Sequence, residues 1–325
     1  MKAAVIGCGI IGRKRALALP DFVELVGCFD EAASVAVTFA TEFKTSNFET
    51  LGELLDIEEL SFVIIATRHD SLHTLAIAAL NAGKHVFIEK PGAINYLEFK
   101  KVCEVARKNN LKVHIGYNHR HHPGLKKAYE LLNSGSIGEV MFLRGRYGHG
   151  GRLGYETEWR ADKIKSGGGE LIDQGAHLID LSIGFLGSLQ IDYVATPNYF
   201  WDMAVEDNVF MSLKNNSGKI AFLQASCTEW KNMFSLEIYG HTGKIEISGL
   251  GRSYGLETLT FHKMLPEMGP PVTENWSFPE PDDSWAIEIG EFLDDLMTGS
   301  NKSDNLDSSL EVLRVIGEMY SRTNR

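Results

Sequence analysis

Short apolar runs alternate with helical patterns through the first third of the chain. Apolar segments predict strands at residues 3–6, 24–29, 62–67, 85–88 and 112–116. Helical periodicity predicts helices between them, at residues 10–19, 32–43, 71–81 and 95–109. Strands that alternate with helices are typical of a parallel, doubly wound sheet. We therefore predict an α/β Rossmann domain over residues 1–120.

The pattern changes after about residue 120. Helical patterns at 123–133 and 170–186 are interspersed with strand candidates at 139–147, 189–195, 205–213, 220–225, 234–239, 244–247 and 258–261. Turn-forming residues join several of these strands, which favours an antiparallel sheet. A proline-rich loop over 266–281 precedes helices predicted at 285–297 and 306–320. We expect a second, α+β domain over residues 121–325.

The first strand leads into Gly7-Cys8-Gly9-Ile10-Ile11-Gly12, a GxGxxG motif. Its glycines would allow a tight turn, close approach of a pyrophosphate and helix–strand packing. The following helix offers N–H groups and a positive dipole end to the phosphates. Asp30 ends the second strand, where a carboxylate accepts hydrogen bonds from a ribose 2′-OH. The unit predicts dinucleotide binding, with Gly7, Gly9, Ile10, Ile11, Gly12 and Asp30 on the coenzyme.

The charges near this motif bear on which coenzyme binds. Asp30 would repel a 2′-phosphate and Glu31 adds negative charge, so NAD is favoured over NADP. The basic run Arg13-Lys14-Arg15 is the counter-argument, unless it forms a solvated helix face.

Composition narrows the class of protein further. A net charge of −11 argues against nucleic acid or an anionic membrane as the main partner. No apolar run approaches the ~18 residues of a membrane span, and a cytoplasmic location is the expectation. The four cysteines lack CxxC spacing, so we expect buried thiols and neither a disulfide framework nor a zinc site.

Lys90 follows a predicted parallel strand, at the sheet edge where ligands bind in such folds. A lysine there could hydrogen-bond a substrate hydroxyl and stabilise a developing alkoxide. The alternative is a surface lysine in a loop.

The helix predicted at 170–186 carries Asp173, His177 and Asp180 within an arc of about 60°. A carboxylate one turn from a histidine can orient the imidazole as a general base. The alternative is a solvated polar face.

The segment His119-Arg120-His121-His122 is rich in histidine and could be interpreted as a metal site. No second cluster has the spacing of metal ligands, so we favour a basic loop that contacts substrate.

Taken together, these motifs resemble those of the glucose–fructose oxidoreductase, inositol dehydrogenase and MocA family. The resemblance rests on GxGxxG with Asp30, Ala66–His73, Glu89-Lys90-Pro91 and Gly167–His177. It implies a Rossmann domain, a second domain with an open, mostly antiparallel sheet, and NAD(P)-dependent oxidation or reduction of sugar and cyclitol hydroxyls. It also implies a homodimer or homotetramer assembled through that sheet.

By this resemblance Lys90, Asp173 and His177 are the catalytic residues. His177 would take the hydroxyl proton, Lys90 would polarise the oxygen, and Asp173 would hold both. The resemblance assigns further residues to the coenzyme: Thr67, His73, Glu89, Asn118, Trp159 and Arg160. We expect Arg68 and Lys90 to contact the coenzyme as well. Arg68 stands where the family's turn has proline.

Arginines cluster in sequence around the expected cleft, at positions 120, 144, 146, 152 and 160. Arg144 and Arg146 are expected to face solvent. We predict the following substrate contacts: Arg120, Arg152, Tyr155, Asp173, His177 and Trp230. Guanidinium groups recognise carboxylates and phosphates, which favours an anionic sugar. The alternative is that these arginines form structural ion pairs with Glu156, Glu158 and Glu229.

The sequence therefore predicts an NAD-dependent oxidoreductase. It would transfer a hydride between nicotinamide and a hydroxyl or ketone carbon of a sugar, sugar acid, nucleotide sugar or cyclitol. Two alternatives remain open: an NAD-dependent glycosidase that acts by transient oxidation and elimination, and a non-catalytic dinucleotide-sensing regulator.

Overall fold

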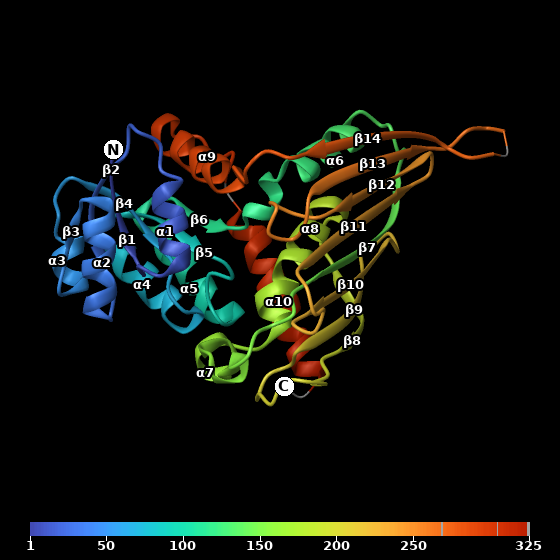
Figure 1. Cartoon of the computed structure of the whole chain (residues 1–325). Coiled ribbons are helices and arrows are strands. Elements are labelled where there is room, and N and C mark those ends of the chain that lie inside the picture. Colours follow the sequence, from blue (N-terminus) through green and yellow to red (C-terminus); the bar gives the residue numbers. More distant parts are fainter. Residues whose placement is uncertain (268, 304, 324–325) are drawn as a thin grey trace. The chain divides into compact units, whose positions relative to one another are not determined.

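The computed structural model describes residues 1–267, 269–303 and 305–323. The chain forms two compact units (Figure 1). The first contains Met1–Tyr117 and Trp285–Leu310, and the second contains Asn118–Ser284 and Glu311–Arg325. The chain passes from the first unit to the second between Tyr117 and Asn118, and the prediction placed the boundary at residue 120. The sequence did not indicate that residues 285–310 return to the first unit.

The first unit is built on a six-stranded sheet in the order β3-β2-β1-β4-β5-β6. The strands are β1 (Lys2–Ile6), β2 (Glu24–Phe29), β3 (Ser46–Asn47), β4 (Leu60–Ile65), β5 (His85–Glu89) and β6 (Val113–Gly116). All neighbours are parallel. The sheet confirms the predicted doubly wound fold. Its strand order reverses between β1 and β4, which is where dinucleotides bind in such sheets.

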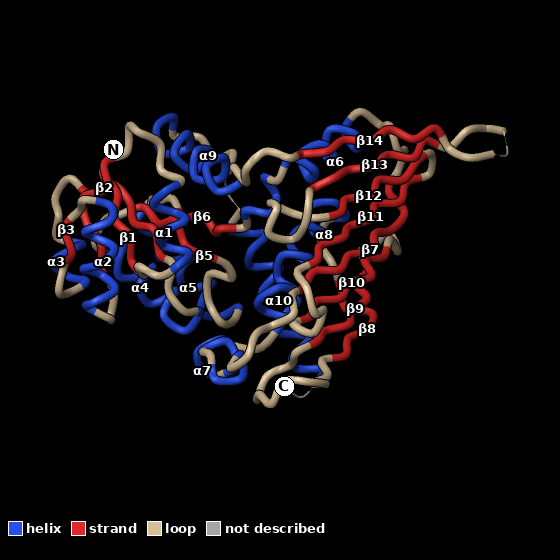
Figure 2. Tube along the Cα trace, viewed as in Figure 1, coloured by secondary structure: helices blue, strands red, loops and turns tan. Residues whose placement is uncertain are grey.

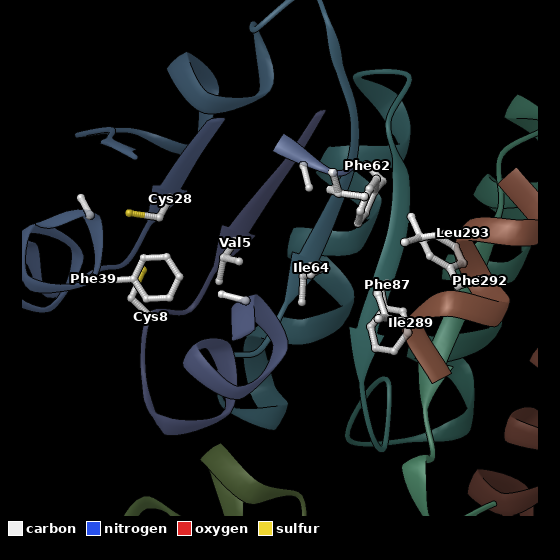
Figure 3. Close-up of a cluster of buried hydrophobic side chains, with 14 residues drawn as sticks. Val5, Cys8, Cys28, Phe39, Phe62, Ile64, Phe87, Ile289, Phe292 and Leu293 are labelled. Carbon is white, nitrogen blue, oxygen red and sulfur yellow. The ribbon is translucent and has the colours of Figure 1, made fainter. Parts of the chain in front are cut away.

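Helices connect these strands: α1 (Ile10–Leu17), α2 (Ala33–Phe43), α3 (Leu51–Leu55), α4 (His69–Asn81) and α5 (Tyr96–Asn109). A later helix, α9 (Ser284–Thr298), completes the core. Figure 3 shows Ile289, Phe292 and Leu293 of α9 packed beside Phe62 and Phe87. The Phe292 ring lies 5.7 Å from that of Phe62 and 5.6 Å from that of Phe87. Burying each large apolar side chain contributes about 1.5–3 kcal/mol, so α9 is part of this core and no mere attachment.

The second unit contains an eight-stranded sheet in the order β14-β13-β12-β11-β7-β10-β9-β8 (Figure 2). The strands are β7 (Val140–Gly148), β8 (Gln190–Ala195), β9 (Asn208–Lys214), β10 (Ile220–Ser226), β11 (Met233–Gly240), β12 (Gly243–Ser248), β13 (Glu257–Lys263) and β14 (Val272–Phe278). Only β7 and β10 pair in parallel, which confirms a mostly antiparallel sheet. Helices α6 (Pro123–Asn133) and α8 (Ala176–Leu186) pack on one face.

The strand β14 corrects the prediction of a proline-rich loop over 266–281. It runs between Pro271 and Pro279 at the edge of the sheet, where the missing N–H groups of proline cost little. Its side chains are mostly exposed, so the sequence shows no alternation of apolar and polar positions. The chain ends in α10 (Leu306–Thr323). No helix in the described ranges is long and apolar enough to span a membrane.

Candidate active site

The GxGxxG turn follows β1 and has the geometry expected for phosphate binding. Gly7 has a φ of 95°, and a Cβ there would lie 2.6 Å from the Ala66 carbonyl oxygen. A Cβ on Gly12 would lie 1.9 Å from the Gly7 oxygen. By contrast, a Cβ on Gly9 would meet nothing within 4 Å. Side chains are thus excluded at two of the glycines, while the backbone at Gly9 faces open space that a pyrophosphate could approach.

Asp30 is held beside this turn by two backbone hydrogen bonds. Its Oδ2 accepts the N–H of Cys8 at 2.8 Å, and its Oδ1 accepts that of Ala32 at 2.9 Å. The carboxylate therefore stands at the end of β2, where a ribose hydroxyl would reach it. Nearby, Arg13 lies 3.5 Å from Glu42. These residues fit NAD.

Arg15 of α1 is fully buried, so the alternative of a solvated basic helix face does not hold for this arginine. Its guanidinium carbon lies 4.4 Å from the centre of the Phe87 ring and 4.3 Å from that of Trp285. It forms ion pairs with Glu89 at 2.6 Å and Glu288 at 2.7 Å. Burial alone would lower the pKa of Arg15, but the two carboxylates raise it overall. This arginine is committed inside the unit and offers no charge to a 2′-phosphate.

Lys90 follows β5 at the carboxyl edge of the sheet and is half-buried, in a cis peptide bond with Pro91. Other predicted coenzyme residues of this unit gather around the start of α4. The Ser71 hydroxyl donates to Thr67 Oγ1 at 2.9 Å, and Arg68 pairs with Asp70 at 3.3 Å. His73 pairs with Glu98 at 3.0 Å. Glu89 contributes its carboxylate to the Arg15 cluster described above.

In the second unit, the predicted helix over 170–186 consists of a π-helical turn (Leu171–Gly175) followed by α8. Such turns interrupt α-helices frequently at functional sites. Asp173, in the π turn, is 7% exposed, and His177 and Asp180 of α8 are 5% and 1% exposed. These values contradict the alternative of a solvated polar face. Asp173 Oδ2 accepts a hydrogen bond from Arg160 Nε at 3.0 Å.

The His177 ring is stacked on that of His119, with centroids 3.7 Å apart and planes at 19°. Tyr147 of β7 sets its ring edge-on to both, at 5.8 Å from His177 and 4.9 Å from His119. The ring centroid of Tyr254 lies 4.9 Å from that of Tyr147. The sequence placed His119 in a basic loop and did not predict this stack. The only available signal was its place four residues before Pro123, where α6 begins.

The rest of the histidine-rich segment has other partners. Arg120 Nε donates to Asp180 at 2.7 Å, and His122 pairs with Glu257 at 3.1 Å. Among the residues that the structure describes, no group of three or more His, Cys, Asp or Glu side chains is placed to hold a metal ion.

Three further arginines of the second unit are paired with carboxylates. Arg152 lies 2.7 Å from Glu158, Arg146 lies 3.0 Å from Glu229, and Arg144 pairs with Glu237. Arg144 and Arg146 are about half exposed, as predicted. This arrangement matches the alternative of structural ion pairs.

Of the remaining predicted residues, Trp159 contacts Arg160, whose guanidinium lies 4.5 Å from the ring centre. Asn118 donates to Ser284 at 3.0 Å. Tyr155 is buried, whereas Trp230 is 65% exposed. The predicted residues thus fall into two groups. The glycine turn, Asp30, the residues around the start of α4, Glu89 and Lys90 belong to the first unit, and the others belong to the second.

Comparison with known proteins assigns both units. Residues 1–117 match the model of an oxidoreductase family with an NAD-binding Rossmann fold, and residues 125–246 match a GFO/IDH/MocA C-terminal domain. The chain belongs to the GFO/IDH/MocA family of oxidoreductases. This confirms the family resemblance, the fold class and an NAD-binding first domain.

Two curated relatives show what this chain is similar to. It is 29% identical over 153 residues to inositol 2-dehydrogenase of Salmonella typhimurium, covering 45% of this chain and 46% of that protein. It is 30% identical over 184 residues to glucose-6-phosphate 3-dehydrogenase of Bacillus subtilis, covering 55% and 52%. The chain thus spans about half the length of these two relatives.

A solved structure matches the whole chain. Levoglucosan dehydrogenase in complex with NADH and L-sorbose superposes with a TM-score of 0.89 at 20% identity, covering 100% of this chain and 96% of that one. At this identity the likeness shows the shared fold.

Proposed function

We propose that the protein transfers a hydride between nicotinamide and a hydroxyl or ketone carbon of a sugar or cyclitol. The observation that carries the proposal is the burial of Asp173 and His177 four residues apart in sequence, with Arg160 bonded to Asp173 and the ring of His119 stacked on His177. A buried imidazole that a carboxylate orients suits proton transfer to or from a hydroxyl, and in this proposal Asp173 is that carboxylate. The similar dehydrogenases named for inositol and glucose 6-phosphate support the substrate class.

In this proposal each side chain has one role. His177 takes the proton of the reacting hydroxyl, while Asp173 orients the imidazole. Lys90, assigned by the family resemblance, stabilises negative charge on the same oxygen. When bound, NAD supplies the nicotinamide carbon that accepts the hydride. Residues of the glycine turn and Asp30 hold the coenzyme.

The side chains of the site favour a neutral sugar or cyclitol as the substrate over the anionic sugar that the sequence favoured. Arg120 and Arg152 already pair with carboxylates, so neither offers an uncompensated charge. Exposed Trp230 stands edge-on to Phe200, with ring centroids 4.7 Å apart. Aromatic faces of this kind pack against the apolar face of a sugar.

The test is an NADH-fluorescence screen of the purified protein against neutral sugars, inositols, sugar acids, sugar phosphates and nucleotide sugars. We expect NADH formation with a neutral ring, at a kcat/KM that changes little with salt or on Arg152→Ala. An anionic best substrate whose rate falls with salt would restore the sequence-based hypothesis. Glycoside cleavage without net NADH, or NAD binding without turnover of any of these compounds, would contradict the proposed function.

A further inference from the structure

Glu170 is a buried carboxyl group that the proposed reaction leaves without a role. It directly precedes the π turn that carries Asp173 and is 1% exposed. Its Oε1 accepts a hydrogen bond from the Tyr155 hydroxyl at 3.1 Å. Its Oε2 is buried without a hydrogen-bond partner of acceptable geometry in the described part of the chain, and Cys227, a weak thiol donor, faces the carboxyl. An ionised carboxylate with so few donors is costly.

The neighbouring carboxyl group of Glu206, by comparison, has three hydrogen-bond donors. Glu206 Oε1 accepts the N–H groups of Gly169 and Leu171, each at 3.1 Å. It also accepts the hydroxyl of Tyr320 at 2.7 Å. Glu170 lies beside this group but shares none of these donors. Burial raises the pKa of Glu206 as well, but Glu170 lacks the backbone donors that would compensate a negative charge there.

The positive charge near Glu170 serves Asp173 instead, because the Arg160 guanidinium bonds to the Asp173 carboxylate. His149 Nε2 lies 3.7 Å from Glu170 Oε1, but its Nδ1 accepts the Gly151 N–H at 3.0 Å. An imidazole that accepts at Nδ1 is neutral, with its proton on Nε2. Burial lowers the pKa of His149, which agrees with a neutral ring.

We propose that Glu170 carries a proton in the active protein and is a positioning residue, which leaves Asp173 as the ionised carboxylate paired with Arg160. The inference rests on the proposed function. The titratable groups facing Glu170 are Asp173, Glu206, His149, Tyr155, Cys227, Tyr147 and Tyr254. Burial, and then the charge of Asp173, raise the pKa of Glu170 to about 8.

Ionisation of Glu170 would place a second negative charge one turn from Asp173. The two carboxylates would compete for Arg160, and the pair that orients His177 would loosen. The site should therefore work below about pH 8 and fail above it. The Tyr155 hydroxyl stabilises the ionised form, so its removal should extend the working range upward.

The activity test compares the parent protein with Glu170→Gln, a neutral isostere, and Tyr155→Phe. Parent kcat/KM should fall about tenfold per pH unit above the pKa. Glu170→Gln should keep near-parent activity at neutral pH and lose this fall, whereas Tyr155→Phe should shift it to higher pH. The same alkaline fall in Glu170→Gln, or loss of activity at every pH, would overturn the proposal.

An infrared pH titration separates this inference from the proposed function. Parent protein should show a carboxylic-acid carbonyl band at neutral pH that disappears on passing through about pH 8, and Glu170→Gln should lack it. Absence of that band overturns the inference whatever the substrate. A band that titrates as expected in a protein that turns over no sugar contradicts the proposed function and upholds the proton on Glu170.

Discussion

Lys90 and His177 are the side chains on which the proposed hydride transfer depends most. Replacing Lys90 with Met or His177 with Ala should lower kcat by about 10²–10⁴-fold, the usual range for loss of an acid–base group. NAD affinity should change far less, because neither residue belongs to the Gly7–Gly12 turn that binds the phosphates. Steady-state kinetics and coenzyme titration measure the two effects.

Matched controls are Lys101→Met on the exposed side of α5 and His262→Ala on β13. Both should turn over like the parent protein. Normal turnover of a verified substrate by either Lys90→Met or His177→Ala would show that the catalytic residues are wrongly assigned.

Asp30 should make the protein prefer NAD to NADP. The carboxylate is fixed by the N–H groups of Cys8 and Ala32, so it cannot swing away from a 2′-phosphate without losing both bonds. Arg15 is buried in ion pairs and offers that phosphate no charge. Titrating both coenzymes into nucleotide-free protein tests the preference, and tighter binding of NADP would contradict it. Asp30→Ala should narrow the difference.

The buried acid of Glu170 should also make stability depend on pH. Its pKa is about 8 in the folded protein, whereas an unfolded glutamate titrates near 4.5. Between these values the unfolded state alone releases the proton, so the free energy of unfolding falls as pH rises and levels off above about 8. The Tm of Glu170→Gln minus that of the parent should therefore increase as the pH rises from 5 to 8. The control Glu104→Gln, at an exposed position of α5, should show no such trend.

At the scale of elements, Arg15 joins α1 to the end of β5 and to α9 through Glu89 and Glu288. Arg15→Met would leave two buried carboxylates without their cation, which costs about 3–5 kcal/mol. Urea unfolding should show a loss of this size. Arg13→Met, whose pair with Glu42 is partly exposed, should cost less than about 1 kcal/mol. Equal losses for the two substitutions would mean that the buried ion pairs of Arg15 stabilise the fold no more than the partly exposed pair of Arg13.

The sequence predicted elements best where burial imposes a strong period. The strand at 24–29 and the helix at 123–133 agree with β2 and α6 at both ends. The π turn was missed because five residues cannot distinguish its period from that of an α-helix. Asp173 and His177 were predicted from their spacing together with the family resemblance. Glu170 and His119 depend on contacts between distant segments, which no local pattern reveals.

At the scale of the whole molecule, the first unit is completed by residues that follow the second in sequence. A fragment ending at Tyr117 would lack Ile289, Phe292 and Leu293, which pack beside Phe62 and Phe87 (Figure 3). It would also lack Glu288, so Arg15 would keep one of its two carboxylates. The coenzyme domain is therefore discontinuous in sequence. Ending the chain after β6 would expose apolar surface that the intact chain buries.

The eight-stranded sheet presents a second apolar surface, on the face opposite α6 and α8. Ile220 and Phe222 of β10 are 41% and 55% exposed, and Tyr193 of β8 is 56% exposed. Phe142 of β7 pairs in register with Ile220 and stacks on Tyr239 of β11 at 4.3 Å. Phe222 lies in register between Ser212 and Arg144, so this face combines apolar with polar side chains. Exposed apolar residues gathered on a sheet face and bordered by polar ones are typical of protein–protein interfaces.

A second copy of this chain is the partner that we expect on that face, as the family resemblance implies. A twofold axis would lay the apolar residues of one sheet against those of the other and bury them without a further protein. Phe222→Glu would place a charge in the middle of the interface and should reduce the mass measured by light scattering toward that of a 36.1 kDa monomer. Phe22→Glu is the matched control, since Phe22 is 53% exposed but belongs to the first unit. A monomeric parent protein, or an unchanged mass for Phe222→Glu, would contradict assembly through this sheet.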